Sequence, residues 1–266
     1  MVKRRGRVAG ADDDPLTQFT DESASLWGDA YGEVARKLLT SAVRCFAANG
    51  FHATTTRDIS TGAGLSPAAL YVHFPSKEQL LFEIVRAGHE DALAAIRDPA
   101  IDDLPDVTAR LRALVSRFVA WHARHHVVGR VCQYELSALT PEHYDHIRKI
   151  RRKFNEAFHD TIAAGVAEGA FAPVDVDRVV RAVLSLGIDV VRWYRPDGPD
   201  SPEWLGDFYA ELALKMVAPT APATSAKRTA RPPGEGRASA GRSAADAAEG
   251  GLRDTPSATA HDPGGR

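Results

Sequence analysis

Residues 54–80 read TTTRDISTGAGLSPAALYVHFPSKEQL, and this stretch decides the fold. It begins with Thr54 and Thr55, either of which offers a side-chain oxygen that caps a short helix running to about Ala63. Gly64 then permits the left-handed backbone conformation that most residues resist. The pattern therefore predicts a short helix that ends in a tight turn.

A second short helix follows the turn. Ser66 caps it, and Pro67 occupies its first position, where a missing N–H removes no hydrogen bond. The helix is expected to run to about Phe74 and to end at Pro75. Two short helices joined by a glycine turn and braced by longer helices are typical of a helix-turn-helix, whose second helix enters the major groove of DNA.

The flanking sequence repeats its apolar residues at the helical period, and no sustained alternation indicates a strand. Ser76 is expected to start a long helix by forming a capping box with Gln79. Asn49-Gly50 is expected to stop the helix before the motif, and the stretch from Asp175 to Tyr194 is apolar over most of its circumference. Further helical stripes occupy 107–122, 141–162 and 202–216. The predicted fold class is all-α.

Composition divides the chain into four parts. Residues 1–30 are expected to be a disordered N-terminal arm, 31–78 a three-helix DNA-binding domain, 79–217 a helical ligand-binding and dimerisation domain, and 218–266 a disordered tail. The tail assignment depends on the 48 residues from Pro219 to Arg266, which contain only one large aliphatic residue, Leu252. Such a segment buries too little apolar surface to repay the entropy of ordering it.

Composition and motifs exclude several classes of protein. The chain is 44% hydrophobic with a net charge of −2, and no stretch of it is apolar enough to span a membrane. Residues 1–10 lack the apolar core of a secretion signal, and Cys45 and Cys132 are too few for a disulfide framework, so a cytoplasmic location is expected. The motifs of hydrolases, nucleotide-binding loops and zinc proteases are missing, so an enzyme is not expected, nor is a cofactor.

The chemistry of the motif suits DNA. Residues 33–77 hold five basic side chains against two acidic ones, a local excess of positive charge. Tyr71 and His73 offer hydrogen-bond donors for phosphates, and the small Ala68 and Ala69 keep the second helix slim enough to approach base edges. Lys77 lies in the first turn of the next helix, where its charge opposes the helix dipole, which is easier to explain if a phosphate lies opposite. The candidate DNA-binding residues are Thr55, Thr56, Arg57, Ser66, Pro67, Ala68, Ala69, Tyr71, Val72, His73 and Lys77.

The same stretch resembles the N-terminal signature of the TetR family of bacterial repressors. The matching elements are Phe46-Ala47, Gly50-Phe51, Thr54-Thr55, Arg57-Asp58-Ile59, Ala63-Gly64-Leu65-Ser66, Leu70-Tyr71, His73-Phe74, Ser76-Lys77-Glu78 and Leu80. One departure is Ala68, where many relatives carry glycine. The resemblance implies phosphate contacts for Thr55, Ser66, Tyr71, His73 and Lys77, and base contacts for Arg57, Pro67, Ala68 and Val72.

In the second half, the resemblance implies a ligand cavity and a four-helix dimer interface built from the last two helices of each subunit. The candidate ligand-binding residues are Trp121, His122, His125, Tyr134, Phe154, Phe158 and Trp193. The candidate dimer residues are Val183, Gly187, Val190, Phe208 and Leu212. The segment 193–199 resembles one found in regulators of lipid and steroid catabolism, several of which respond to acyl-CoA thioesters. The basic residues Arg148, Lys149, Arg151 and Arg152 are candidates for the CoA phosphates, or else a solvated helix face.

The expected function is that of a dimeric repressor that leaves a palindromic operator when a small-molecule effector binds, with an acyl-CoA or another lipid-derived molecule as the expected class. Two alternatives stay open. His122 and His126, four residues apart on one expected helix, suit a metal-responsive regulator, although no other residues complete a four-ligand site. The second alternative is a DNA-binding protein that responds to no ligand.

Overall fold

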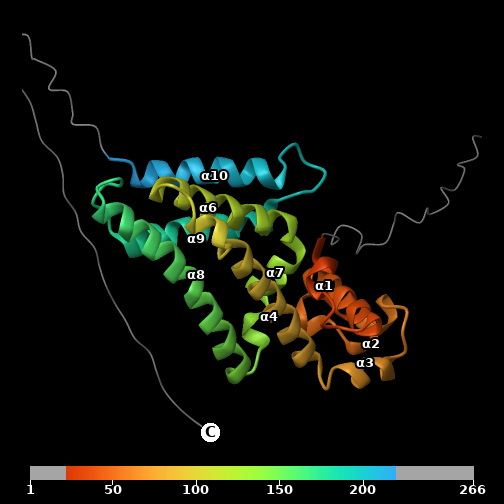
Figure 1. Ribbon diagram of the computed structural model, residues 1–266. Coiled ribbons are helices and arrows are strands. Elements are labelled where there is room, and N and C mark those ends of the chain that lie inside the picture. Colours follow the sequence, from red (N-terminus) through yellow and green to blue (C-terminus); the bar gives the residue numbers. More distant parts are fainter. Residues whose placement is uncertain (1–21, 220–266) are drawn as a thin grey trace, which may run out of the picture. The chain divides into compact units, whose positions relative to one another are not determined.

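The computed structural model describes residues 22–219, which fall within a single unit of the chain (Figure 1). Every regular element in this range is a helix, so the predicted all-α class is confirmed. Residues 1–21 and 220–266, which make up most of the expected arm and tail, lie outside the described residues.

The last part of the expected arm is folded. Residues Glu22–Trp27 form a short 3-10 helix, η2, and the Trp27 side chain is only 1% exposed. Its indole Nε1 donates a hydrogen bond to Thr40 Oγ1 at 2.9 Å. The prediction of disorder is therefore wrong for residues 22–30, because one tryptophan provides the apolar surface that anchors the segment to the following helix.

Three helices form the N-terminal part of the described chain: α1 (Glu33–Ala53), α2 (Thr56–Gly62) and α3 (Pro67–His73). Thr55 caps α2 in a reciprocal capping box, since its hydroxyl accepts from the Asp58 N–H at 3.1 Å and the Asp58 carboxylate accepts from the Thr55 N–H at 2.9 Å. Gly50 has a φ of 77°, so α1 is kinked at the predicted stop and then continues for one more turn to Ala53.

Helix α4 (Lys77–Ile96) connects this domain to the second half of the chain (Figure 1). Ser76 accepts a hydrogen bond from the Gln79 N–H at 3.0 Å, as predicted. The other half of the predicted capping box is not formed, because the Gln79 side chain donates instead to Glu83 Oε1 at 3.0 Å. Ser76 thus caps α4 alone.

The second half consists of α5 (Pro99–Asp102), α6 (Val107–Arg124), α7 (His126–Tyr134), the short 3-10 helix η3 (Leu136–Ala138), α8 (Pro141–Ala167), α9 (Val176–Trp193) and α10 (Pro202–Val217). Side chains of Asp106, Thr140, Asp175 and Ser201 cap α6, α8, α9 and α10. Helix α10 lies along α6 over much of its length (Figure 1). Within residues 22–219, no helix is long and apolar enough to cross a membrane.

Candidate nucleic-acid interface and internal cavity

Helix α3 presents large apolar side chains to solvent. Leu70 is its single buried residue and anchors it to the core, whereas Tyr71 is 56% exposed and Val72 is 80% exposed. Pro67, Ala68 and His73 are exposed on the same short helix. Adjacent exposed apolar residues mark an interaction surface more often than a structural need. The outward face of α3 is therefore a surface shaped for a partner.

Helix α2 holds α3 in place. The hydroxyls of Thr56 and Tyr71 lie 3.3 Å apart, which ties the start of α2 to the end of α3. Ser41 of α1 donates to the Ile59 carbonyl at 2.7 Å and fixes α2 from behind. Arg57 is exposed beside α3. All the candidate DNA-binding residues are exposed or half-buried, and the ones on α2 and α3 are brought together by this packing.

Lys77 has a structural role that the sequence did not indicate. Its ammonium donates to the Phe51 carbonyl at 2.7 Å and to the Thr54 carbonyl at 2.6 Å, and it lies 4.2 Å from the centre of the Phe51 ring. Burial lowers the pKa of Lys77. A cation that satisfies the last carbonyls of α1 stabilises the negative end of that helix. The partners are more than 20 residues away, so no local pattern reveals the contact.

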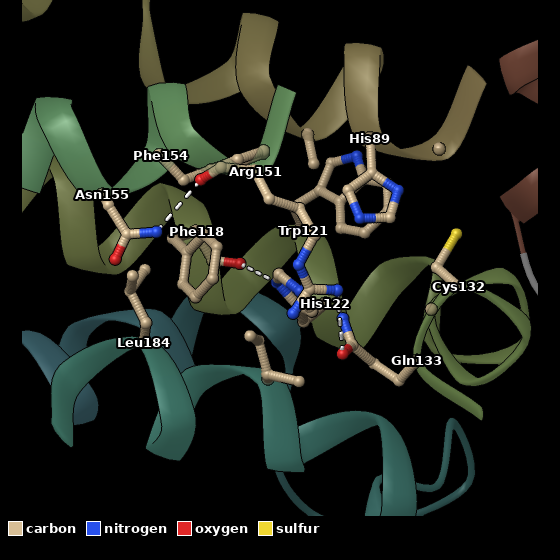
Figure 2. Close-up of a pocket in the computed structure, with 14 residues that line it drawn as sticks. His89, Phe118, Trp121, His122, Cys132, Gln133, Arg151, Phe154, Asn155 and Leu184 are labelled. Atoms are coloured by element: carbon tan, nitrogen blue, oxygen red, sulfur yellow. Dashed lines mark hydrogen bonds between the residues drawn. The ribbon is translucent and has the colours of Figure 1, made fainter. Parts of the chain in front are cut away.

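An internal cavity of about 70 Å³ lies among α4, α6, α7, α8 and α9 (Figure 2). Its walls are mostly apolar, with a few polar side chains between them. The lining residues are Gly88, His89, Ala92, Phe118, Trp121, His122, Gly129, Cys132, Gln133, Arg151, Phe154, Asn155, Leu184 and Ile188.

Three of the predicted ligand-binding residues, Trp121, His122 and Phe154, line this cavity. The other four do not line it. Phe158 is buried behind Phe118, His125 packs against Trp121, and Tyr134 and Trp193 are 55% and 40% exposed at the surface. Helical periodicity places an aromatic residue on the inward face of its helix, but the neighbouring helices decide whether it meets a cavity or solid core.

His89 and His122 are the most unusual residues of the cavity. Burial lowers the pKa of each to about 4, so both imidazoles are neutral near pH 7. Burial likewise raises the pKa of the Cys132 thiol to about 12, so it is a protonated, unreactive group. His89 was missed in the sequence, although a histidine within the apolar stripe of α4, between Val85 and Leu93, is a pattern that points inward.

Arg151 lines the cavity from α8. Its guanidinium donates to Gln133 Oε1 at 3.4 Å, and no salt bridge to a carboxylate is found for it among the described residues. Arg151 and Asn155 also line a second hollow, on the outer face of α8, together with Tyr144, Arg148 and Arg152. The internal cavity and this basic surface hollow therefore share two residues.

The geometry does not favour a metal site. His122 and His126 lie on separate helices, because α6 ends at Arg124 and the chain bends at His125. Their Nδ1 atoms contact the carbonyls of Phe118 at 2.7 Å and Ala123 at 3.1 Å. In the part of the chain that the structure describes, no three His, Cys, Asp or Glu side chains converge.

The predicted dimer residues on α9 are buried within the subunit. Val183 and Val190 are 4% and 0% exposed, and a Cβ atom on Gly187 would lie 2.8 Å from the ring of Phe118. These residues pack within the subunit against α6, and they leave no surface for a partner. Phe208 is 46% exposed and Leu212 half-buried, as an interface on α10 requires.

Other large apolar side chains of α9 and α10 are exposed as well. Leu186 on α9 is 42% exposed, and Trp204 and Met216 on α10 are 53% and 39% exposed. Trp204 and Phe208 stack with ring centroids 5.3 Å apart. We call Leu186, Trp204, Phe208 and Met216 the exposed apolar face. The sequence analysis missed three of its members, because α9 and α10 each carry apolar residues on more than one side.

Two family models match the chain: "Bacterial regulatory proteins, tetR family" over residues 38–84, and "Tetracyclin repressor-like, C-terminal domain" over residues 105–217. The HTH-type transcriptional repressor KstR2 of Mycobacterium tuberculosis is 33% identical over 180 residues, which cover 67% of this chain and 90% of that protein. The solved structure of this ketosteroid transcriptional regulator has a TM-score of 0.66 at 31% identity, covering 71% of this chain and 97% of that one.

Two further solved structures are similar. A regulatory protein of the tetR family from Rhodococcus RHA1 is 39% identical with a TM-score of 0.66, covering 72% of this chain and 100% of that chain. AibR, solved in complex with isovaleryl coenzyme A and operator DNA, has a TM-score of 0.61 at 24% identity, covering 68% and 97% of the two chains, and thus shares the fold. The chain belongs to the TetR family of bacterial transcriptional regulators, which are not enzymes.

Proposed function

We propose that the protein is a cytoplasmic, homodimeric repressor that binds a palindromic operator and is released from it by a small-molecule effector. The observation that carries the proposal is the exposed face of α3, where Tyr71 and Val72 point to solvent from a helix that Leu70 and α2 hold rigidly. Two such helices in a dimer engage consecutive major grooves about 34–36 Å apart.

The exposed apolar face supports the dimer. Leu186, Trp204, Phe208 and Met216 gather on the last two helices, and aromatic residues and methionine are enriched at protein interfaces. A second copy of the chain, with its own exposed apolar face, is the partner that we propose. The pairing sets the separation of the two α3 helices and therefore the spacing of the operator half-sites.

Helix α4 provides the route from effector to DNA. It begins beside the helix-turn-helix, where Lys77 holds the end of α1, and reaches the cavity with His89 about three turns later. At its start, Glu78 accepts hydrogen bonds from the Thr140 N–H at 2.9 Å and from His143 at 2.8 Å, which joins α4 to α8. A movement of α4 relative to α8 therefore changes the position of α3.

The size of the cavity explains how an effector moves α4. A cavity of about 70 Å³ is smaller than the roughly 300–1,000 Å³ that binding sites for small molecules usually occupy. An effector larger than a few water molecules has to push the surrounding helices apart. Since only differential affinity shifts an equilibrium, effector and operator then weaken each other's binding reciprocally.

We propose an acyl-CoA as the effector class. An apolar cavity suits an acyl group, and the basic hollow with Arg148 and Arg152 on the outer face of α8 suits phosphates. Arg151 and Asn155 belong to both, so a molecule with an acyl end and a phosphate end can occupy them together. The name of KstR2, a ketosteroid transcriptional regulator, supports a lipid-derived effector, and AibR, which shares the fold, was solved with isovaleryl coenzyme A.

The test is a fluorescence anisotropy titration of labelled DNA fragments from the upstream region of the protein's own gene, at low ionic strength. We expect the anisotropy of at least one palindromic fragment to rise when the protein is added. One or more acyl-CoA thioesters should release that fragment and lower the anisotropy again. Val72→Asp, which places a charge on the exposed face of α3, should abolish binding while the thermal unfolding midpoint stays unchanged. A protein that binds no fragment better than a scrambled sequence would contradict the proposal.

A further inference from the structure

Two histidines of the cavity are held in one tautomer. His89 Nδ1 lies 2.8 Å from the Val85 carbonyl, and His122 Nδ1 lies 2.7 Å from the Phe118 carbonyl, each one turn earlier in its own helix. A carbonyl oxygen only accepts hydrogen bonds, so Nδ1 must carry the proton in both rings. Because burial keeps both rings neutral, the second nitrogen, Nε2, has no proton and is an acceptor.

The Nε2 atoms are turned away from the helices. In each imidazole, Nε2 lies on the side of the ring opposite the carbonyl that Nδ1 contacts, and both rings belong to the cavity wall (Figure 2). Within residues 22–219, no protein hydrogen bond is found for either Nε2 atom. The two residues are only 7% and 5% exposed, so bulk water does not reach them freely.

The other polar side chains of the cavity do not replace a donor at this place. Asn155 donates to the Arg151 carbonyl at 3.1 Å, and Arg151 donates to Gln133, all on the side of α8 and α7. After burial, the charge of Arg151 is a further cause that lowers the pKa of both rings, so its guanidinium lies near them, and the apolar side chains of Phe118, Trp121 and Leu184 line the same cavity. The indole N–H of Trp121 is already bonded to Asp91 at 2.7 Å. Two acceptors therefore face a mostly apolar cavity, and among the described residues no protein donor is found hydrogen-bonded to either of them.

A ligand that fills this space with carbon alone would leave two desolvated acceptors without a donor, and each such group costs about 1–3 kcal/mol. We propose that the part of the effector that enters the cavity carries a hydroxyl group, which donates a hydrogen bond to Nε2 of His89 or of His122. This inference rests on the proposed effector site and specifies its chemistry: a hydroxylated acyl or ring system is favoured over the corresponding hydrocarbon.

The probes are phenol and toluene, which have nearly the same shape and differ by a hydroxyl in place of a methyl group. An apolar cavity favours toluene, because phenol has to give up its hydrogen bonds to water. In the full-length protein we expect phenol to bind about 3–10 times more tightly than toluene, the ratio that one net hydrogen bond supplies. Ligand-observed NMR titration measures both affinities.

Nitrogen-15 spectra of histidine-labelled protein give a second readout. We expect both rings in the Nδ1–H tautomer, and phenol, unlike toluene, should shift an Nε2 signal. Of the two variants His122→Phe and His89→Phe, at least one should still bind toluene but should no longer bind phenol more tightly than toluene. Ile188→Val, which changes the same cavity without changing a polar group, is the control and should keep the preference.

Two outcomes overturn the inference and are distinguishable. If toluene binds as tightly as phenol, or if the histidines carry the proton on Nε2, the hydroxyl preference is wrong and the effector site stands. If neither probe binds and acyl-CoA thioesters also leave the operator complex intact, the effector site of the proposed function is wrong as well.

Discussion

At the scale of single residues, the cavity histidines make stability depend on pH. Folding lowers the pKa of His89 and of His122 from 6.5 to about 4, because burial disfavours the charged ring. The unfolded chain therefore binds protons first as the pH falls. The neutral rings contribute their full stability above about pH 6.5, and this contribution is lost progressively between pH 6.5 and 4.

We predict that the free energy of unfolding falls over this range by at most about 3 kcal/mol for each of the two residues. Urea unfolding at a series of pH values measures it. In His122→Phe the pH dependence between 6.5 and 4.5 should become shallower by up to one proton, whereas Ile188→Val, which removes no titratable group from the same cavity, should leave the slope unchanged. Equal slopes in wild type and His122→Phe would contradict the assignment.

Substitution of Lys77 tests two roles of this residue, one in the stability of the fold and one in binding to DNA. Lys77→Ala removes the donor from two carbonyls at the end of α1, so we predict a loss of about 1–3 kcal/mol in the free energy of unfolding. The control Lys37→Ala breaks an exposed pair with Glu33 and should cost much less. If Lys77 also binds a phosphate, the slope of the logarithm of the operator binding constant against the logarithm of the salt concentration becomes shallower by about one unit in Lys77→Ala. An unchanged salt slope would leave Lys77 with the structural role alone.

Arg57 tests base recognition. It is exposed next to α3, and α3 itself offers few hydrogen-bonding side chains besides Tyr71 and His73. Arg57→Ala should therefore relax the preference at one base position of each half-site, with a cost of about 1–3 kcal/mol for the preferred base. Competition titrations with operators altered one position at a time measure this. If Arg57→Ala instead lowered the affinity equally for operators altered at any position, Arg57 would bind the DNA backbone.

At the scale of helices, small residues set how closely the elements pack. The contact between α10 and α6 depends on Gly206, where a Cβ atom would lie 2.5 Å from the Ser116 carbonyl oxygen. That oxygen belongs to the backbone of α6 and cannot move aside without displacing the helix. In the same way, Gly187 brings α9 against the Phe118 ring, so the glycine predicted to admit a second subunit serves the packing within one subunit.

We predict that Gly206→Ala lowers the free energy of unfolding by about 1–3 kcal/mol, the usual cost of forcing an extra carbon into a packed contact. Thermal or urea unfolding measures the change. Gly32→Ala is the comparison variant, because a Cβ atom there meets nothing within 4 Å; Gly32 is the N-cap of α1, so this substitution is expected to show only the cost of a poorer cap. Similar effects of the two substitutions would show that α10 and α6 are not tightly packed at Gly206.

At the scale of the whole molecule, repression requires two subunits and a connection between effector and DNA. In the proposed function, the exposed apolar face joins the two subunits, and α4 with its contacts at Glu78 connects the effector to the DNA. Since the operator is held by two α3 helices at once, a monomer loses most of its affinity.

We predict that Phe208→Glu converts the dimer into a monomer, because it places a charge at the centre of the exposed apolar face. Light scattering after gel filtration measures the mass, and operator affinity should fall at least tenfold. Tyr134→Glu, an equally exposed aromatic residue on α7, should leave the dimer intact. A Phe208→Glu protein that remains a dimer would place the interface elsewhere.

The sequence alone determined the helices and the DNA-binding motif, because both depend on neighbours within a few residues. The cap at Thr55, the turn at Gly64 and the start at Pro67 act locally, and their spacing also carried the family resemblance. The all-α class followed from the same helical period.

The tertiary structure alone decided which inward residues meet a cavity and which outward residues remain uncovered. His89 and Arg151 come together from α4 and α8, which lie about 60 residues apart in the chain. Val183 and Val190 proved to be core, and Leu186 surface, because α6 covers one side of α9. The physical reason is that a periodic pattern defines the apolar side of a helix, whereas the element that covers this side is set by packing between distant segments.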